Sequence, residues 1–279
     1  MKKNLVLSTV LCALVASACT ANVMAADGNI TAEAIKGTPV IDGVVDDIWA
    51  SASTNTANAL KDGTDEGITT QWKAMWDDDK LYLLIAVVND TAHFFNGAQS
   101  WGDGCELYFD ALNNDPTDYT SDDGVVQIGW DAETPTDTAY KGTDAAQANI
   151  VGKYQVCAVE NADGYLYEIA VDLDAFCPDV VMAEGTVIGF DIQINSKSDD
   201  SESRTSAYGW ADAANVGWQD PSVFGDILLA AAPVVDETPA EDGAPAADGA
   251  EAPVTADAGI VAAAAVMAMA AGVVLTKKK

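Results

Sequence analysis

The sequence has few of the residues on which metal-dependent and nucleophilic enzymes rely. Its only histidine is His93, which leaves little basis for a Ser-His-Asp triad or a histidine-ligated zinc centre. Basic residues are also scarce, because 13 Lys and Arg face 44 Asp and Glu, giving a net charge of −31. A surface this acidic repels nucleic acid and anionic lipid headgroups, and it suits neutral ligands and divalent cations.

Cysteine is sparse as well. Of the five cysteines, three lie outside the N-terminal segment that we expect to be removed: Cys105, Cys157 and Cys177. An odd number in an exported protein leaves at least one free thiol or an intermolecular bridge. Their spacing matches no zinc motif, so we interpret them as small core residues, with a bridge between Cys157 and Cys177 as an open alternative.

Residues 1–25 have the features of a secretory signal peptide. Two lysines precede an apolar run over residues 5–18, and Ala25 ends a small-residue cleavage site. The run is too short for a permanent membrane-spanning helix. The alternative is a lipoprotein box in which Cys19 becomes the lipidated N-terminus.

Residues 256–279 predict a C-terminal anchor. An apolar stretch over residues 258–276 is just long enough to span a bilayer, and the three closing lysines would stay in the cytoplasm. The preceding residues 252–257 resemble the sorting motif of Gram-positive cell-wall proteins, with Ala252 in place of Leu and Ala256 in place of Gly. We therefore expect a secreted protein on the surface of a Gram-positive bacterium, held by a membrane helix or a degenerate sorting signal.

Residues 231–255 carry four prolines among Ala, Gly, Asp and Glu, and no aromatic residue, which predicts a disordered stalk. Residues 30–230 remain as one folded domain of about 200 residues, large enough for a hydrophobic core. Apolar residues recur there with a period of two, and only residues 48–57 and 174–176 allow short helical turns. Many short strands without intervening helices predict an all-β domain, an antiparallel, jelly-roll-like β-sandwich.

Alternation also assigns polar side chains to one face of the sheet. In residues 188–195 apolar and polar side chains alternate, which places Gln193 on the solvent face. The same count in the two strands around Glu106 and Gln127 places these side chains on a solvent face too. Carboxylate and amide groups in such positions can donate to and accept from sugar hydroxyls in fixed directions.

Two of the tryptophans stand apart from the others. Trp101 and Trp218 lie in turn-rich polar surroundings, where an exposed indole ring can stack on the flat face of a sugar. The alternative is that each of them plugs one end of the sandwich core. Four tryptophans lie in apolar runs and are predicted to be core residues: Trp49, Trp72, Trp76 and Trp130.

Four segments together resemble the family 9 carbohydrate-binding modules found in xylanases and other glycan-processing surface proteins. They are residues 39–49 (PVIDGVVDDIW), 73–83 (KAMWDDDKLYL), 101–110 (WGDGCELYFD), and 187–195 (VIGFDIQIN) followed by 210–226. They occur in the family's order and cover nearly the whole predicted domain. The resemblance implies a non-catalytic β-sandwich that clamps a saccharide, often a chain end, between two tryptophans.

On this resemblance, the clamp is formed by Trp101 and Trp218. The polar contacts with the ligand fall to three side chains, Glu106, Gln193 and Asn215. Gln127 stands where the family can carry an Arg that braces the ligand. A glutamine in place of that arginine removes a directional, charged donor and puts affinity and ligand choice in question.

The family also carries structural calcium, and oxygen-rich loops in this sequence are candidates to hold it. The candidate ligands are Asp42, Asp46, Asp110 and Asn113. A calcium ion needs several oxygens that converge at one point, which spacing alone does not establish. Each cluster could instead be a solvated turn.

The sequence thus favours non-catalytic carbohydrate binding at the cell surface, in support of the degradation of glycans such as xylan or cellulose. One alternative is a structural or adhesive surface protein that no longer binds sugar. Another is a glycoside hydrolase, since two carboxyl groups suffice for that chemistry, although no pair of acids is distinguished from the rest. A third is a haem-binding sandwich with His93 and either Met75 or Met182 as axial ligands.

Overall fold

The computed structural model describes residues 23–24, 30–88, 90, 102–131, 139–198 and 204–232. Contacts divide the chain into Met1–Val235 and Asp236–Lys279, and all of the described residues belong to the first unit. The predicted signal peptide, stalk and anchor lie outside the described residues except at residues 23–24 and 231–232. Within the described ranges, no helix combines the length and the hydropathy that a membrane span requires.

The described part of the chain is almost entirely β-structure, as the period of two predicted. The strands are β1 (Val23–Met24), β2 (Ile30–Lys36), β3 (Asn55–Thr56), β4 (Ala59–Gly63), β5 (Thr69–Trp76), β6 (Lys80–Val88), β7 (Gly104–Asp110), β8 (Val125–Asp131), β9 (Ala139–Lys141), β10 (Tyr154–Glu160), β11 (Gly164–Asp172), β12 (Val187–Ser196), β13 (Ser206–Gly209) and β14 (Gly225–Ala230). The short helices are η2 (Asp47–Ser51), α1 (Asp144–Ile150), α2 (Leu173–Phe176) and η4 (Pro221–Val223).

Helix α1 was not predicted. It begins where the Thr143 hydroxyl accepts a hydrogen bond from Ala146 N at 3.0 Å, and it buries Ala146 and Ile150. The Thr-Asp start of this segment is a recognisable capping signal. Only two turns follow, so no long apolar period reveals the helix in the sequence.

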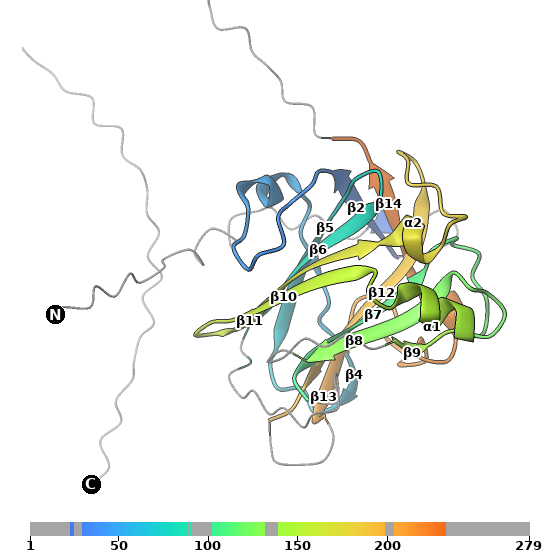
Figure 1. The fold of residues 1–279 in the computed structure, drawn as a ribbon. Helices are drawn as coiled ribbons and strands as arrows, with labels where there is room; N and C mark the ends of the chain where they lie inside the picture. The colour runs from blue at the N-terminus through green and yellow to red at the C-terminus, as the bar shows by residue number, and fades with distance from the viewer. Residues whose placement is uncertain are drawn as a thin grey trace, which may run out of the picture. The chain divides into compact units, whose positions relative to one another are not determined.

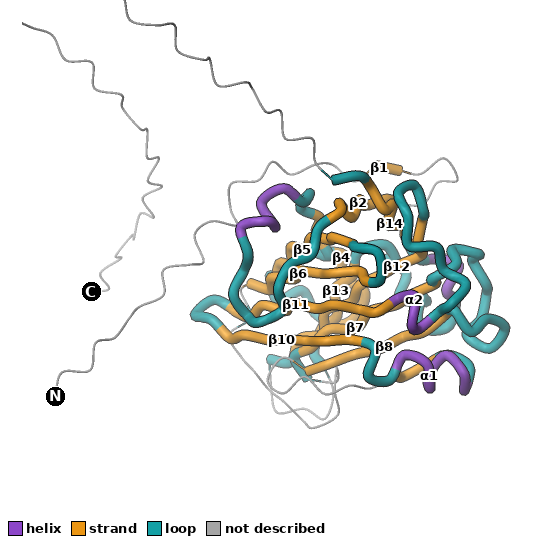
Figure 2. Tube along the Cα trace, turned by 45° about the horizontal axis from the view of Figure 1, so that its top comes forward, coloured by secondary structure: helices purple, strands orange, loops and turns teal. Residues whose placement is uncertain are grey.

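The strands form one hydrogen-bonded sheet in the order β10-β11-β6-β5-β2-β14-β12-β7-β8-β9, and β13 and β4 extend it beside β12 (Figure 1). The sheet folds over so that its two halves face each other across a core (Figure 2). The prediction of a purely antiparallel sandwich was wrong in one place. Strand β2 pairs in parallel with both β14 and β5, joining the two halves. Alternation reports which face a side chain occupies, but it does not report the direction of neighbouring strands.

Large aromatic side chains fill the core between the two halves. The Trp72 ring centroid lies 5.5 Å from that of Phe190 and 4.9 Å from that of Trp210. At the other side of the sandwich, the centroids of Trp130 and Tyr154 are 5.1 Å apart and join β8 to β10. The prediction that Trp49, Trp72, Trp76 and Trp130 are core residues is confirmed, because all four are buried.

A second, smaller core lies on the opposite side of β5, β6 and β11. Residues 37–54, here called the strap, cover this side, and Ile41 and Trp49 of the strap pack with Met75, Tyr82 and Leu84. This side of the sheet is called the strap face below. Because the strap covers its outer surface, β6 is buried on both sides, as its unbroken apolar run predicted.

The possible bridge between Cys157 and Cys177 is wrong. All three cysteines in the described ranges are free thiols. Cys177 packs in the main core, whereas Cys157 contacts the cluster under the strap, so the sheet separates the two sulfur atoms.

Candidate functional site

Polar side chains gather on the outer side of β7, β8 and β12, away from the main core. The strand register places Glu106 opposite Gln193, and Tyr108 opposite both Gln127 and Asp191. The name polar face is used below for this set, which consists of Glu106, Tyr108, Gln127, Asp191, Gln193 and Asn195. Alternation therefore predicted correctly that Glu106, Gln127 and Gln193 lie on the side of the sheet away from the core.

The Glu106 carboxylate is the centre of the polar face. It accepts hydrogen bonds from the Tyr108 hydroxyl at 2.5 Å, Gln127 Nε2 at 2.8 Å and Asn195 Nδ2 at 2.8 Å. Gln193 Nε2 in turn donates to Asn195 Oδ1 at 2.9 Å. Burial, together with the neighbouring Glu106, holds the pKa of Tyr108 well above its ordinary value. The side chains thus fix one another's orientation.

The expected solvent exposure of this face is wrong. Glu106 is 6% exposed, Gln127 7% and Gln193 2%. The physical reason is that these side chains bond to one another and that longer side chains, from β4 and from the segment just before β13, reach over them. A single-strand pattern contains no information about such covering groups. One acceptor is left over, since Gln127 Oε1 is buried without a hydrogen-bond partner.

Arg204 brings a positive charge to this face that the sequence argument missed. Its Nη1 donates to Asn195 Oδ1 at 3.2 Å and lies 3.9 Å from Glu106 Oε1, while Nη2 pairs with Asp62 Oδ2 at 3.3 Å. Arg204 is the only arginine of the chain. This rarity, just before the strand Ser206–Gly209, was a signal that could have been used.

A buried lysine also reaches the polar face. Lys61 Nζ of β4 lies 3.6 Å from Asp191 Oδ2 and 3.2 Å from Asp212 Oδ2, and its side chain is 1% exposed. The aliphatic part of this side chain crosses Gly209, where an added Cβ would lie 2.4 Å from Lys61 Cδ. A side chain at position 209 would therefore displace the lysine from its two carboxylates.

Asp212 fixes the loop that carries the exposed tryptophan. Its Oδ2 accepts from Val216 N at 2.9 Å and Gly217 N at 2.7 Å, while the main-chain N–H of Asp212 donates to Asp191 Oδ2 at 3.0 Å. Burial opposes ionisation of Asp212, but Lys61 and the two backbone donors outweigh it and lower the pKa. The charged carboxylate thus holds the loop against the edge of the polar face.

Trp218 lies at the end of this loop and is 44% exposed. Its Nε1 donates to Asn215 O at 3.1 Å, and Asn215 takes a positive φ of 56° to allow the turn. Lys141 Nζ lies 4.4 Å from the Trp218 ring centroid and also donates to the Trp218 carbonyl oxygen. The indole is therefore oriented as well as exposed, which rules out the core-plug interpretation for Trp218. Its predicted partner, Trp101, lies outside the described residues.

Asp110 and Asn113, both predicted as calcium ligands, lie together at the far end of β7. Each has a buried Oδ1 atom without a hydrogen-bond partner, and burial raises the pKa of Asp110. Gly189 lies opposite Asp110, where an added Cβ would be 2.9 Å from Asp110 Cβ and 3.0 Å from Asn113 Oδ1. Asp226, 4% exposed, lies opposite Gly189 on its other side. This oxygen-rich cradle suits a hard cation.

Asp42 and Asp46, the other two predicted ligands, lie in the strap and serve its backbone. Asp42 Oδ1 accepts from Val44 N at 2.9 Å, and Asp46 Oδ2 accepts from Val40 N at 2.7 Å. Among the residues that the structure describes, no group of three or more His, Cys, Asp or Glu side chains converges as a metal site. A calcium site at Asp110 would thus depend on amide and carbonyl oxygens as well. His93 of the haem alternative lies outside the described residues.

Comparison with known proteins gives a consistent result. A family model described as "Carbohydrate family 9 binding domain-like" matches residues 41–232. The exoglucanase XynX of Acetivibrio thermocellus is 33% identical over 202 residues, which are 72% of this chain and 17% of that enzyme. Endo-1,4-beta-xylanase A of Thermoanaerobacterium saccharolyticum is also 33% identical over 202 residues, 72% of this chain and 16% of the enzyme. The chain therefore spans about a sixth of the length of these relatives.

Solved structures agree with the sequence comparison. A carbohydrate-binding module of family 9 from Caldicellulosiruptor kristjanssonii, in complex with glucose, is 25% identical with a TM-score of 0.62, covering 75% of this chain and 100% of that one. The same kind of module from that organism in complex with cellotriose is 26% identical, also with a TM-score of 0.62, covering 76% of this chain and 99% of that one.

Proposed function

Because this chain belongs to the carbohydrate family 9 binding domain-like proteins, we propose that it binds a neutral saccharide on the polar face, beside Trp218, without catalysing a reaction. The observation that carries the proposal is the oriented, half-exposed Trp218 ring next to a hydrogen-bonded set of amide and carboxylate groups. Sugar sites combine these two elements, since a ring stacks on the apolar face of the sugar and polar groups bind its hydroxyls. The glucose and cellotriose complexes of similar modules support this choice of ligand.

Within this site, Gln127 and Arg204 have complementary roles. Gln127 Nε2 is held by Glu106, so the unpartnered Oε1 atom is the acceptor that a sugar hydroxyl can use. Arg204 supplies the cation that Gln127 does not, because its guanidinium reaches Asn195 and Glu106 from the segment just before β13. The absence of an arginine at position 127 is thus compatible with sugar binding. Trp101 is the second ring of the proposed clamp.

The same hydrogen bonds favour binding over hydrolysis. A general acid must carry a proton that it can transfer to the leaving oxygen. The Glu106 carboxylate instead accepts hydrogen bonds from three side chains, which occupy the oxygen lone pairs that such a proton would need. We expect the protein to release no reducing sugar from cello- or xylo-oligosaccharides.

The test of the binding site is calorimetry with glucose and cellotriose on wild type and Trp218→Ala. Loss of an anchoring aromatic ring costs about 2 kcal/mol or more, which is on the order of thirtyfold in affinity. The melting temperature should stay close to wild type because the ring is 44% exposed. Val44→Ala, at a strap residue that is 60% exposed, is the matched control and should bind normally. If Trp218→Ala stays folded and binds with unchanged affinity, the sugar site lies elsewhere.

We also propose that Asp110, Asn113 and Asp226 hold a calcium ion, which stabilises the end of the sandwich where β7 ends. An ion bound only by the folded state raises its stability by mass action, so a chelator should lower the melting temperature. Asn113→Gly removes one ligand while suiting the positive φ of 49° at this position. It should reduce the calcium-dependent shift, whereas Asp46→Asn should leave it unchanged. No response of the wild type to chelator or calcium would exclude this site.

A secreted, surface-anchored location completes the proposal, and it is supported by the sequence of the two ends of the chain. The position would let the domain hold glycans such as xylan or cellulose near degrading enzymes. Mild protease treatment of intact cells should release a fragment that contains the sandwich, because an extended acidic stalk is easily cleaved. Full-length protein that is found in the cytosol and protected from protease would contradict this location.

A further inference from the structure

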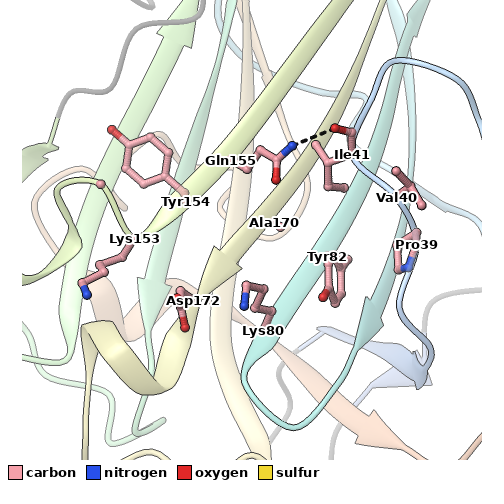
Figure 3. Close-up of a pocket in the computed structure, with 11 residues that line it drawn as sticks. Pro39, Val40, Ile41, Lys80, Tyr82, Lys153, Tyr154, Gln155, Ala170 and Asp172 are labelled. Carbon is pink, nitrogen blue, oxygen red and sulfur yellow. Dashed lines mark hydrogen bonds between the residues drawn. The ribbon is translucent and has the colours of Figure 1, made fainter.

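A pocket separate from the polar face lies on the strap face, where the strap leaves part of the sheet uncovered. Its volume is about 420 Å³, within the range of small-molecule sites, and it lies between the strap and strands β6, β10 and β11 (Figure 3). None of the residues proposed for the polar-face site lines it. The pocket and the polar face belong to opposite halves of the sandwich, so one ligand cannot occupy both.

The strand register explains the shape of the pocket. Ala170 of β11 lies opposite Gln155 of β10 on one side and Tyr82 of β6 on the other. The small alanine forms a floor between two larger side chains. One row further along, Asp172 lies opposite Lys80, and its main-chain N–H donates to the carbonyl oxygen of Lys153 at 2.7 Å.

The polar groups around this floor are positioned before any ligand arrives. Gln155 Nε2 donates to Ile41 O at 2.8 Å, which fixes the amide and leaves its oxygen to accept from a ligand (Figure 3). The Tyr82 hydroxyl donates to Asp77 Oδ2 at 2.6 Å, so the Tyr82 ring stands as a fixed wall. The Lys80 and Lys153 ammonium groups both interact electrostatically with the Asp172 carboxylate, which also lines the pocket. Two of the 13 basic residues of the chain therefore line this one pocket.

We propose that this pocket is a second saccharide subsite that takes one neutral sugar residue. It offers donors in Lys80 and Lys153, acceptors in Asp172 and Gln155, and an aromatic wall in Tyr82. That mixture matches a ring with hydroxyls at its edge and an apolar face. A neutral ligand is required because Asp172 and the general excess of acidic residues offset the two lysines.

The ligand class rests on the function proposed for the polar face, whereas the site itself is independent of it. Two sugar sites on opposite halves of the sandwich would let one molecule hold two glycan chains, or two stretches of one chain. The second contact then acts at high effective concentration, so binding to a polysaccharide becomes tighter than binding to a short oligosaccharide.

The test follows backbone amide shifts of the full chain during titration with cellotriose, because the two sites report on different residues. We expect saturable shifts at Gln155 and Ala170 in wild type and in Trp218→Ala. The double variant Lys153→Ala/Gln155→Ala should weaken the binding reported by the Ala170 amide on the order of tenfold, since it removes one charged and one neutral hydrogen bond. Both side chains are exposed, so the fold should be retained. Val151→Ala, at an exposed neighbouring residue, is the control and should bind like wild type.

Each outcome separates this proposal from the first one. If wild type shows shifts near Trp218 but none at Gln155 and Ala170, the second subsite is wrong and the first stands. If the shift at Ala170 persists unchanged in the double variant, the pocket is not its cause. Glucuronate that binds there more tightly than glucose would overturn the assignment to a neutral sugar.

Discussion

The two outer faces of the sandwich both bury charged side chains, but they satisfy them differently. On the polar face, the Glu106 carboxylate is bonded by the side chains of Tyr108, Gln127 and Asn195. On the strap face, Glu168 Oε2 accepts from the backbone N–H groups of Asp42 and Gly43, at 3.2 and 2.7 Å. Bonds between side chains orient groups that can meet a ligand, whereas bonds from a side chain to the backbone hold a segment in place.

The two faces also differ in how well their buried charges are compensated. On the polar-face side, Lys61 and backbone donors outweigh burial and lower the pKa of Asp212. On the strap face, burial dominates, so it raises the pKa of Glu168 and lowers that of Lys73. Lys73 Nζ donates only to Trp49 O among the described residues, at 2.7 Å, and Glu168 Oε1 is buried without a partner. The strap is thus held by charges that are less well compensated than those beside the proposed site.

The largest effect should come from removing the apolar anchor of the strap. Trp49 is 1% exposed and packs in the cluster beneath the strap. Trp49→Ala should lower the free energy of unfolding by about 3–5 kcal/mol through lost burial and a cavity. Urea denaturation measures this, with Ile48→Ala as the control because that neighbour is 39% exposed. The fraction that stays folded should bind cellotriose normally at the polar face, as followed by amide shifts near Trp218, and a loss of affinity at that site would mean that the two faces are coupled.

Removing the buried cation of the polar-face side should have the next largest effect. Lys61→Met leaves Asp191 and Asp212 close together without their partner, which costs about 3–5 kcal/mol for a buried pair. It should also weaken sugar binding, because Asp212 holds the loop that carries Trp218. The matched control is Lys36→Met, since the Lys36–Asp78 pair is 45% and 81% exposed and contributes about 1 kcal/mol or less. Equal stability of the two variants would show that Lys61 is not needed for charge compensation.

The fold was predictable from the sequence because strand alternation is a local property. The period of two identified the strands around Glu106, Gln127 and Gln193 and the faces that they present, and the unbroken apolar run at Lys80–Val88 predicted burial on both sides. The parallel pairings of β2 were not predictable in this way, because they depend on where the N-terminal strand inserts. Helix α1 was missed because two turns are too short for a periodic signal.

The candidate site was predictable only in part. Loop composition identified Trp218 as exposed, and strand alternation placed Glu106 and Gln193 on one face. Arg204 and Lys61 escaped notice because their long side chains reach the polar face from outside its three strands, Lys61 from β4 and Arg204 from the segment just before β13. The shielding of the polar face has the same origin, since it depends on tertiary contacts rather than on the strand that carries each residue.

Acidification should reduce the difference between wild type and Lys61→Met. In wild type, the lowered pKa of Asp212 adds stability that is present above its ordinary value of 3.8 and is lost as the pH falls through the lower folded value. In the variant, burial without Lys61 should raise that pKa, so protonation relieves the unpaired charge as the pH falls. Denaturation at a series of pH values should show the largest gap near pH 7 and a smaller one below pH 4. A gap that is independent of pH would assign the loss to packing.

The smallest effect is expected at Glu168, and its sign is opposite to that at Asp212. Burial raises the pKa of Glu168 above its ordinary value of 4.5, so wild type loses stability as the pH rises from 4.5 through the folded value. Glu168→Gln keeps an oxygen that can accept from Asp42 N and Gly43 N, and it removes the buried charge. We expect the variant to equal wild type below pH 4 and to be more stable near pH 7, because burial raises the pKa of Glu168. Thermal denaturation at the two pH values measures this. If Glu168→Gln is instead less stable at pH 7, the negative charge itself holds the strap, and the strap face resembles the polar face more closely than its hydrogen bonds indicate.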